Sequence, residues 1–374
     1  MSQISIYKCD ILIVLNSLVA EGCPQLSLNL ACYWKSRGLN VELICIDKFP
    51  NDLLKEFNEN NIKINFYNPL SRGLIRYFNL VFFTFKVCKK LKPKAILCFP
   101  FGWHFFVSLG AKLANVKNIC THIGNYPPLN DGSMFKFKLL VLLGRLFTRK
   151  CICCSDYIME SSIKYFLLPR KSLCRIYNCC DIGKFDKFIN QKYFSKDKNL
   201  HLGMVARLEK HKDQSTLIKA IPEILKYDLK VRVSIIGDGS RRQFLEKLVR
   251  SLGVESMVDF LGSRRDIPEL LSELDVFVFS AKVDEGFGIA LAEAMVAGVP
   301  ILASNVGACK EILCNGKYGY LFEESNPKDL AKKIIFMNKH SKDVKRKVEG
   351  AKKYARENFS IDKMANSYLK YLIL

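Results

Sequence analysis

The chain has 374 residues, of which 49% are hydrophobic and 25% charged, so it is long enough for two ordinary folded domains. Its net charge of +22 favours anionic partners, such as nucleic acid, phosphorylated small molecules or an acidic membrane surface. Most of this charge is N-terminal: residues 1–190 contain 26 Lys and Arg against 12 Asp and Glu. Between residues 70 and 150 there are 14 basic residues and a single acid, Asp131.

The fifteen cysteines are scattered and often lie in apolar runs, which is typical of small buried side chains rather than of a disulfide framework. Cys151–Cys154 and Cys179–Cys180 raise the alternative of a metal site, but they lack zinc-site spacing and no metal is expected. Met1–Asp10 lacks the pattern of a secretory signal peptide, and no apolar run is long enough to cross a bilayer. We therefore expect a cytoplasmic protein.

Short apolar runs alternate with helical patterns along the N-terminal half. Strands are predicted at residues 10–15, 41–46, 62–66, 95–99 and 116–121, and helices at 26–36, 74–91 and 103–114. Continuous apolar strands, each followed by a helix, indicate a parallel sheet that is covered on both faces.

A second alternation follows a polar, charged spacer at residues 194–199, with strands predicted at 202–205, 231–236, 258–261, 276–279 and 300–303. The predicted fold class is therefore α/β, with two Rossmann-like doubly wound domains that face each other across a cleft. We expect domains at residues 1–190 and 191–350, and a terminal helix within 351–374 that returns toward the N-terminal domain. Ligands should bind at the carboxyl ends of the strands.

The segment Asp284–Ala294 contains two acids seven residues apart, Glu285 and Glu293, around a glycine loop and the start of a helix. The glycines allow close approach to a ligand, and the helix N-terminus offers N–H groups to an anion. Glu293 lies about one turn inside the helix, where a carboxylate suits a ribose diol, and Glu285 could hold the hydroxyls of a second sugar. The alternative is an acidic first turn that only complements the helix dipole.

A cationic pair, Arg207 and Lys212, follows the first strand of the second alternation. Arg207 is expected to end the strand and Lys212 to open the next helix, so both lie at the ligand-binding edge. Two cations there could neutralise a diphosphate leaving group without a metal, although solvated surface charges remain the alternative. The nearby Gly237-Asp238-Gly239 is read as a tight turn into a helix, because Arg242 stands where a dinucleotide fingerprint needs glycine.

In order and spacing, residues 201–322 resemble the retaining glycosyltransferases with two Rossmann-like domains, the GT-B fold of group 1 or family 4. The matching pieces are Gly203…Arg207…Lys212, Ile236–Gly239, Phe260–Gly262, Glu285–Gly288 with Glu293–Pro300, Gly307…Glu311 and Gly316…Gly319.

The resemblance implies site residues across the donor domain. Arg207 and Lys212 would bind the donor diphosphate, and Glu293 would hold the ribose. Glu285 and the backbone of the following residues would contact the transferred sugar, namely Gly286, Phe287, Gly288 and Ile289. Gly203 would belong to the donor site, and the loop from Gly262 to Arg264 would lie beside the base.

The N-terminal half resembles the family less closely. Gly22 occupies the place of a glycine-rich phosphate loop, but Cys23 stands where relatives carry a second glycine. His122 ends a predicted strand, where family members place a histidine near the donor sugar; a histidine that merely caps a strand end is the alternative. His104 is read as a core or surface residue rather than an acceptor ligand.

The resemblance implies a retaining hexosyl transfer from a nucleotide-sugar, with a UDP-sugar favoured, to a hydroxyl of a glycan or lipid-linked glycan in polysaccharide synthesis. The catalytic set would be Arg207, Lys212, His122 and Glu285, with no cofactor. A nucleotide-sugar hydrolase or epimerase on the same fold is one alternative. A nucleic-acid-binding protein is another, although no motif supports it and no nucleic-acid partner is expected.

Two basic, apolar segments at residues 74–94 and 134–150 suit an anionic membrane surface. They predict a polyprenyl-linked acceptor and peripheral attachment to the inner face of the plasma membrane. Ordinary buried helices of a basic protein are an equally good interpretation of the same pattern.

Overall fold

A computed structural model describes residues 8–20, 22–68, 74–129, 134–188 and 199–373. The chain divides into two units, Met1–Cys179 with Ile361–Leu374 and Cys180–Ser360. The expected boundary at residue 190 lies outside the described residues. The units instead meet in sequence at Cys179–Cys180 and at Ser360–Ile361, so residues 351–360 belong to the second unit and the segment from Ile361 belongs to the first.

The first unit is built on a parallel sheet in the order β3-β2-β1-β4-β5-β6-β7. Its strands are β1 (Cys9–Leu15), β2 (Val41–Cys45), β3 (Lys63–Phe66), β4 (Pro93–Cys98), β5 (Asn118–Ile123), β6 (Lys150–Cys153) and β7 (Leu173–Arg175). Its helices are α1 (Gly22–Ser36), α2 (Leu54–Glu59), α3 (Leu74–Leu91), α4 (His104–Leu113), α5 (Met134–Arg145), α6 (Asp156–Phe166) and α14 (Ile361–Leu372).

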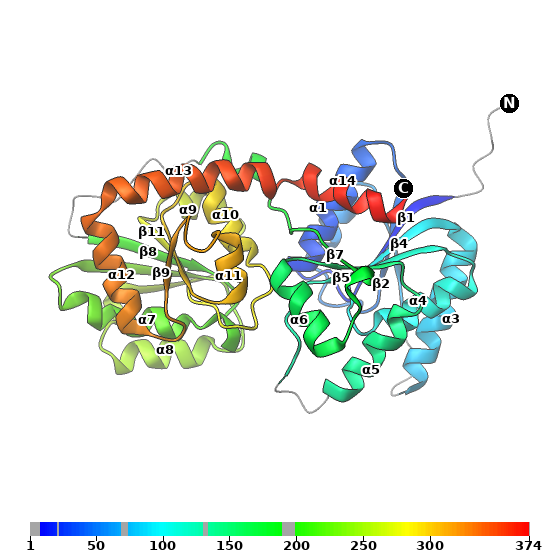
Figure 1. Ribbon diagram of the computed structural model, residues 1–374, viewed down its shortest axis with the longest axis horizontal. Coiled ribbons are helices and arrows are strands. Elements are labelled where there is room, and N and C mark those ends of the chain that lie inside the picture. The colour runs from blue at the N-terminus through cyan, green and yellow to red at the C-terminus, as the bar shows by residue number, and fades with distance from the viewer. Residues whose placement is uncertain (1–7, 21, 69–73, 130–133, 189–198, 374) are drawn as a thin grey trace. The chain divides into compact units, whose positions relative to one another are not determined.

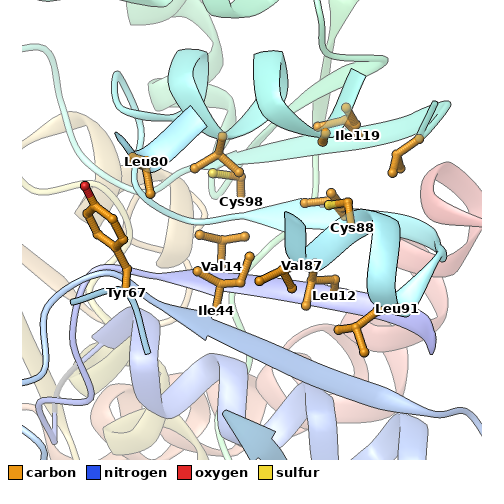
Figure 2. Packing of buried hydrophobic residues seen from close by; sticks show 14 of the residues in the cluster. Leu12, Val14, Ile44, Tyr67, Leu80, Val87, Cys88, Leu91, Cys98 and Ile119 are labelled. Carbon is orange, nitrogen blue, oxygen red and sulfur yellow. The ribbon is translucent and has the colours of Figure 1, made fainter. Parts of the chain in front are cut away.

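Continuous apolar strands produce this sheet, because a strand that is covered on both faces needs no polar alternation. All five residues of β2 are buried, as are six of the seven in β1. Figure 2 shows Leu80, Val87, Cys88 and Leu91 of α3 packed over Leu12 of β1 and neighbouring strand residues. The predicted strands are all present, whereas β6 and β7 were missed because they are short and follow basic segments.

The second unit contains a parallel sheet in the order β10-β9-β8-β11-β12-β13. Its strands are β8 (Asn199–Val205), β9 (Lys230–Ile236), β10 (Val258–Gly262), β11 (Val276–Phe279), β12 (Ile301–Ser304) and β13 (Tyr320–Phe322). Its helices are α7 (Gln214–Leu225), α8 (Arg242–Ser251), α9 (Ile267–Ser272), α10 (Ile289–Ala297), α11 (Gly307–Ile312), α12 (Pro327–Lys339) and α13 (Ser341–Asn358) (Figure 1). Two doubly wound sheets confirm the predicted Rossmann-like fold of each domain.

The last helix, α14, packs on α1, β4 and β5 of the first unit. The indole Nε1 of Trp34 donates a hydrogen bond to the carbonyl oxygen of Ala365 at 3.3 Å, and both residues are fully buried. The side chain of Tyr368 is also fully buried. The C-terminal segment is therefore part of the first unit's core and not an appendage.

Each of the fifteen cysteines is a free thiol, and eleven of them are buried. Within the described ranges, no three His, Cys, Asp or Glu side chains form a group that could hold a metal ion. Across the same residues, no helix is both long and apolar enough to span a bilayer.

Candidate donor site and a buried histidine

The predicted donor-site residues gather where the strand order of the second sheet reverses. β8 and β11 are neighbours in the sheet, and the strands that follow each of them in sequence, β9 and β12, lie on opposite sides of this pair. Ligands of open α/β sheets bind at the carboxyl ends of such a pair of strands. Arg207 and Lys212 lie after β8, and Glu285–Ile289 follows β11. The two predicted loops therefore occupy one edge of the sheet.

Lys212 and Glu285 form an ion pair at this edge. The Nζ atom of Lys212 lies 2.5 Å from Oε2 of Glu285, and only 16% and 8% of their side chains are exposed. Burial acts to raise the pKa of Glu285, but the charge and hydrogen bond of Lys212 outweigh burial and lower it. Lys212 is predicted to meet a diphosphate, and the structure shows that it also pairs with the predicted sugar-binding acid.

Backbone amides of the glycine loop also support the Glu285 carboxylate. The N–H of Gly286 donates to Oε1 at 3.2 Å. The backbone N–H of Phe287 donates a further hydrogen bond, which lowers the pKa of Glu285. The Phe287 ring is buried and meets Phe359 edge-on, with ring centroids 5.4 Å apart. The side chain of Phe287 therefore belongs to the core, and its backbone holds the acid.

Asp213, which sequence reasoning missed, fixes the loop that carries Lys212. Its carboxylate accepts hydrogen bonds from the hydroxyls of Ser215, Thr216 and Ser325, and its carbonyl accepts one from Ser280. Lys212 does not open the following helix as predicted: it lies in a 3-10 turn, and α7 begins at Gln214. An aspartate directly before a helical pattern suggests an N-cap, but the Asp213 side chain makes no capping hydrogen bond to the backbone of α7 and binds hydroxyl groups instead.

Glu293 is the one charged residue of α10, whose sequence is IALAEAMVA. Burial raises its pKa to about 7; the charge of Lys184 lowers it by less, and the charge of Asp181 raises it further. The first turn of α10 contains no acid, so the alternative of an acidic first turn that complements the helix dipole is wrong. A partly buried carboxylate on an apolar helix is costly without a polar partner. A bound ligand can supply that partner, so such a carboxylate is expected in a ligand-binding site.

The glycines of the predicted site differ in their structural roles. Gly288 directly precedes Ile289, the first residue of α10. Its φ of +78° lies in the left-handed region, which glycine adopts without steric cost. Gly203 lies inside β8, where a Cβ would come within 2.5 Å of the Leu274 side chain. Packing in the sheet interior therefore gives a structural reason for glycine at position 203.

The loops after β9 and β10 complete this edge of the sheet. The Gly237 N–H donates to the carbonyl of Gly262 at 2.8 Å, which holds the two loops together. The tight turn predicted at Asp238 is confirmed: Gly237 has a φ of +133° and α8 begins at Arg242. The guanidinium of Arg264 is paired with Asp266.

In the first unit, His122 lies near the carboxyl end of β5 and is 1% exposed. Its Nδ1 lies 2.8 Å from the hydroxyl of Tyr368 on α14, and its ring packs on Phe99. Burial lowers the pKa of His122 to about 4, so the ring is neutral at physiological pH. Among the described residues, its Nε2 has no hydrogen-bond partner. A Cβ at Gly124 would lie 3.0 Å from that buried nitrogen, so glycine avoids a tight contact with the ring.

Gly22 and His104 also lie in the first unit. Gly22 is the first residue of α1, and no atom lies within 4 Å of the position of an added Cβ, so packing does not require glycine there. His104 is a core residue, as predicted: it accepts a hydrogen bond from Gly102, and burial lowers its pKa to about 3.

The family model described as glycosyl transferases group 1 matches residues 185–355. The chain is 26% identical to the N-acetyl-alpha-D-glucosaminyl L-malate synthase of Bacillus anthracis, in an alignment that covers 54% of this chain and 53%, about half, of that relative's length. It is also 26% identical to the UDP-Gal:alpha-D-GlcNAc-diphosphoundecaprenol alpha-1,3-galactosyltransferase of Escherichia coli, over 81% of each chain.

A solved structure from Anabaena, Alr3699/HepE in complex with UDP and glucose, has a similar fold. The two structures superpose with a TM-score of 0.83 over 97% of this chain and 98% of that one, at 19% sequence identity.

Proposed function

Since residues 185–355 match the family model of the group 1 glycosyltransferases and the chain has the GT-B fold, we propose that it transfers a hexose from UDP to a lipid-linked glycan, with retention of anomeric configuration. One observation carries the donor assignment: the cationic loop after β8 and the glycine loop after β11 meet at the reversal point of the second sheet. The UDP in the Anabaena complex and the lipid diphosphate in the name of the Escherichia coli relative support the choice of donor and acceptor.

In the proposed reaction, the bond between the anomeric carbon and the donor phosphate oxygen breaks while a bond to the acceptor oxygen forms. The acceptor proton passes to a donor phosphate oxygen, and a nucleoside diphosphate leaves. The guanidinium of Arg207 and the ammonium of Lys212 stabilise the negative charge that develops on this diphosphate. No strong general acid is needed, because the leaving group is good once its charge is held.

Glu293 holds the ribose hydroxyls in this proposal, and Glu285 with the loop Gly286–Ile289 contacts the transferred sugar. Glu285 keeps its pair with Lys212 when a donor binds, since the ammonium group has three N–H donors and the pair uses one. The loop from Gly262 to Arg264 lies beside the base.

His122 is assigned to the sugar hydroxyls near the reacting centre. Its ring is neutral, so one nitrogen donates and the other accepts. When the Tyr368 hydroxyl donates to Nδ1, the proton is on Nε2, and Nε2–H can donate to a sugar oxygen. Tyr368 thus sets the tautomer that the proposed contact needs.

The test begins with a panel of UDP-, GDP-, ADP- and TDP-hexoses in a thermal-shift assay, because the true donor stabilises the fold by mass action. Turnover is then measured with a lipid-linked glycan acceptor, and NMR of the product gives the anomeric configuration. An inverted product would refute retention. Release of free hexose at the same rate with and without acceptor would replace the transferase by a nucleotide-sugar hydrolase.

Arg207→Ala is the sharpest test of the leaving-group assignment, because a change at Lys212 would also disturb Glu285. We expect kcat/KM to fall by roughly 100-fold. Arg250→Ala is the matched control, since Arg250 is an exposed arginine near the end of α8 and should leave turnover unchanged. Equal turnover in the two variants would refute the role of Arg207.

A further inference from the structure

An apolar groove lies between α3 and α4, on the first unit. Its volume is about 660 Å³, within the range of small-molecule sites. Eight residues line it, all of them apolar: Phe78, Val81, Phe82, Phe85, Phe105, Phe106, Leu109 and Leu113. The two helices are neighbours in the fold (Figure 1).

The groove exists because α3 has two apolar faces. One face, with Leu80, Val87 and Leu91, packs on the sheet (Figure 2). The other repeats at helical spacing through the groove residues, and Phe78 and Phe82 on it are 73% and 56% exposed. A helix at the surface of a globular protein normally has one apolar stripe and a polar outer face. The second stripe therefore indicates a contact outside this chain.

α3 and α4 approach each other closely, so their outward-facing side chains are not buried in the contact between them. At Gly110 of α4, a Cβ would lie 2.3 Å from the Val81 carbonyl oxygen, so only glycine permits this spacing. On the α4 side, Leu113 is 58% exposed. The outer rings and methyl groups thus form an open surface rather than a closed pocket.

The surroundings of the groove are cationic. The Nζ of Lys86 lies 4.3 Å from the centroid of the Phe82 ring, and that of Lys89 lies 5.7 Å from the Phe85 centroid. Between residues 70 and 150 the sequence contains 14 Lys and Arg and one acid, Asp131. Two copies of such a surface repel each other, so a homodimer through this groove is disfavoured. The positive charge around the groove and its apolar lining are together complementary to an anionic, amphiphilic surface.

We propose that the outer faces of α3 and α4 form a docking surface for a bilayer that contains anionic lipids. The phenylalanines enter the boundary between headgroups and acyl chains, and the lysines bind lipid phosphates. This inference deepens the proposed function and rests on it. Membrane docking has a purpose because a lipid-linked acceptor is presented at the bilayer surface.

The topology supports this purpose. α4 begins just after the carboxyl end of β4, and His122 lies at the carboxyl end of the adjacent strand β5. Because neighbouring parallel strands end at the same edge of the sheet, the Phe105 end of the groove and His122 share that edge. A bilayer docked on the groove would bring acceptor headgroups to the side of the sheet that carries His122.

The experiment is flotation of the full chain with vesicles of phosphatidylcholine, with and without phosphatidylglycerol, at low and high salt, because the anionic lipid supplies the negative surface potential. We expect binding to the anionic vesicles alone and its loss at high salt. Phe78→Ser with Phe82→Ser, and separately Lys86→Glu with Lys89→Glu, should each weaken binding roughly tenfold or more. Phe244→Ser is the control, an aromatic of α8 in the second unit that is 43% exposed, and it should bind as wild type.

Equal binding by the groove variants and wild type would overturn the proposal, as would equal binding to neutral and anionic vesicles. A wild-type dimer that Phe82→Ser dissociates in light scattering would reassign the groove to a second copy of the chain. Turnover with a water-soluble short-chain acceptor separates this inference from the proposed function. The groove variants should keep that turnover and lose turnover with a vesicle-borne acceptor, whereas a wild-type chain that binds vesicles without any transfer would contradict the function alone.

Discussion

The ion pair between Lys212 and Glu285 gives a quantitative prediction. Lys212→Met removes the ammonium group that lies 2.5 Å from a carboxylate of which only 8% is exposed. The methionine fills most of the same space, so the main change is an uncompensated buried charge. Breaking a buried pair in this way costs about 3 to 5 kcal/mol.

The hydrogen bond from the Gly286 amide remains in the variant and keeps the expected loss near the lower end of that range, about 3 kcal/mol. For a domain of roughly 150 to 250 residues, each kcal/mol lowers Tm by about 2 to 4 °C. The unit Cys180–Ser360 falls in this size class, so its Tm should fall by about 9 °C.

The stability difference should also depend on pH. In the wild type the folded-state pKa of Glu285 lies below its ordinary value of 4.5, so its contribution is complete above pH 4.5 and is lost as pH falls further. Without Lys212, burial dominates and raises the pKa above 4.5. The variant then loses stability as pH rises from 4.5 toward neutrality, so the two curves separate between these limits and converge in acid.

Hydrogen exchange is the suitable assay, because both tryptophans, Trp34 and Trp103, lie in the first unit and their fluorescence does not report on the second. Peptides that cover α7 and α10 should exchange faster in Lys212→Met at pH 7.5. The control is Lys226→Met, which removes an exposed pair with Glu223 on α7 and should change stability by less than about 1 kcal/mol.

Adding Glu285→Gln to Lys212→Met should restore most of the lost stability, because no buried charge is then left unpaired. Wild-type protection in Lys212→Met, with an unchanged pH dependence, would refute the conclusion that Lys212 keeps Glu285 ionised.

Three further changes test other parts of the structure. Glu293 has a pKa raised to about 7, so the ligand-free fold should lose up to about 3 kcal/mol between pH 4.5 and 8, and Glu293→Gln should flatten this slope in calorimetry. UDP affinity should rise through the same pH range in the wild type alone; a pH-independent affinity would argue against a ribose-binding carboxylate. Gly237→Ala should destabilise by about 2 kcal/mol or more in urea unfolding, because its φ is +133° and a Cβ would meet a backbone carbonyl at 2.1 Å. Gly22→Ala is its neutral counterpart, and equal stability of the two variants would contradict the steric reasoning. Tyr368→Phe removes the hydrogen bond to His122 at a cost of about 1 kcal/mol, and the ¹⁵N shifts of the ring should report a changed tautomer balance. Unaltered shifts would show that Tyr368 does not set the tautomer.

Local residue patterns were sufficient to predict the strands and the motifs that follow them. Residues 276–279 were predicted as a strand and form β11 with the same bounds, and the helix predicted at 74–91 is α3. These features are local, since apolar runs and helical periodicity are properties of neighbouring residues. The order of the predicted loops along the chain also placed Arg207 and Glu285 after strands, where ligands of α/β sheets bind.

Which side chains meet could be learned only from the folded arrangement of the chain. Lys212 and Glu285 are 73 residues apart in sequence, and no local pattern predicts that they form a pair. The motif suggests that Gly203 is a site residue. The structure adds that the neighbouring side chain of Leu274 leaves no space for a Cβ at this position. Tyr368 reaches His122 across 246 residues because α14 packs on the first unit. Such contacts arise from chain topology, which fixes distances that residue spacing alone does not contain.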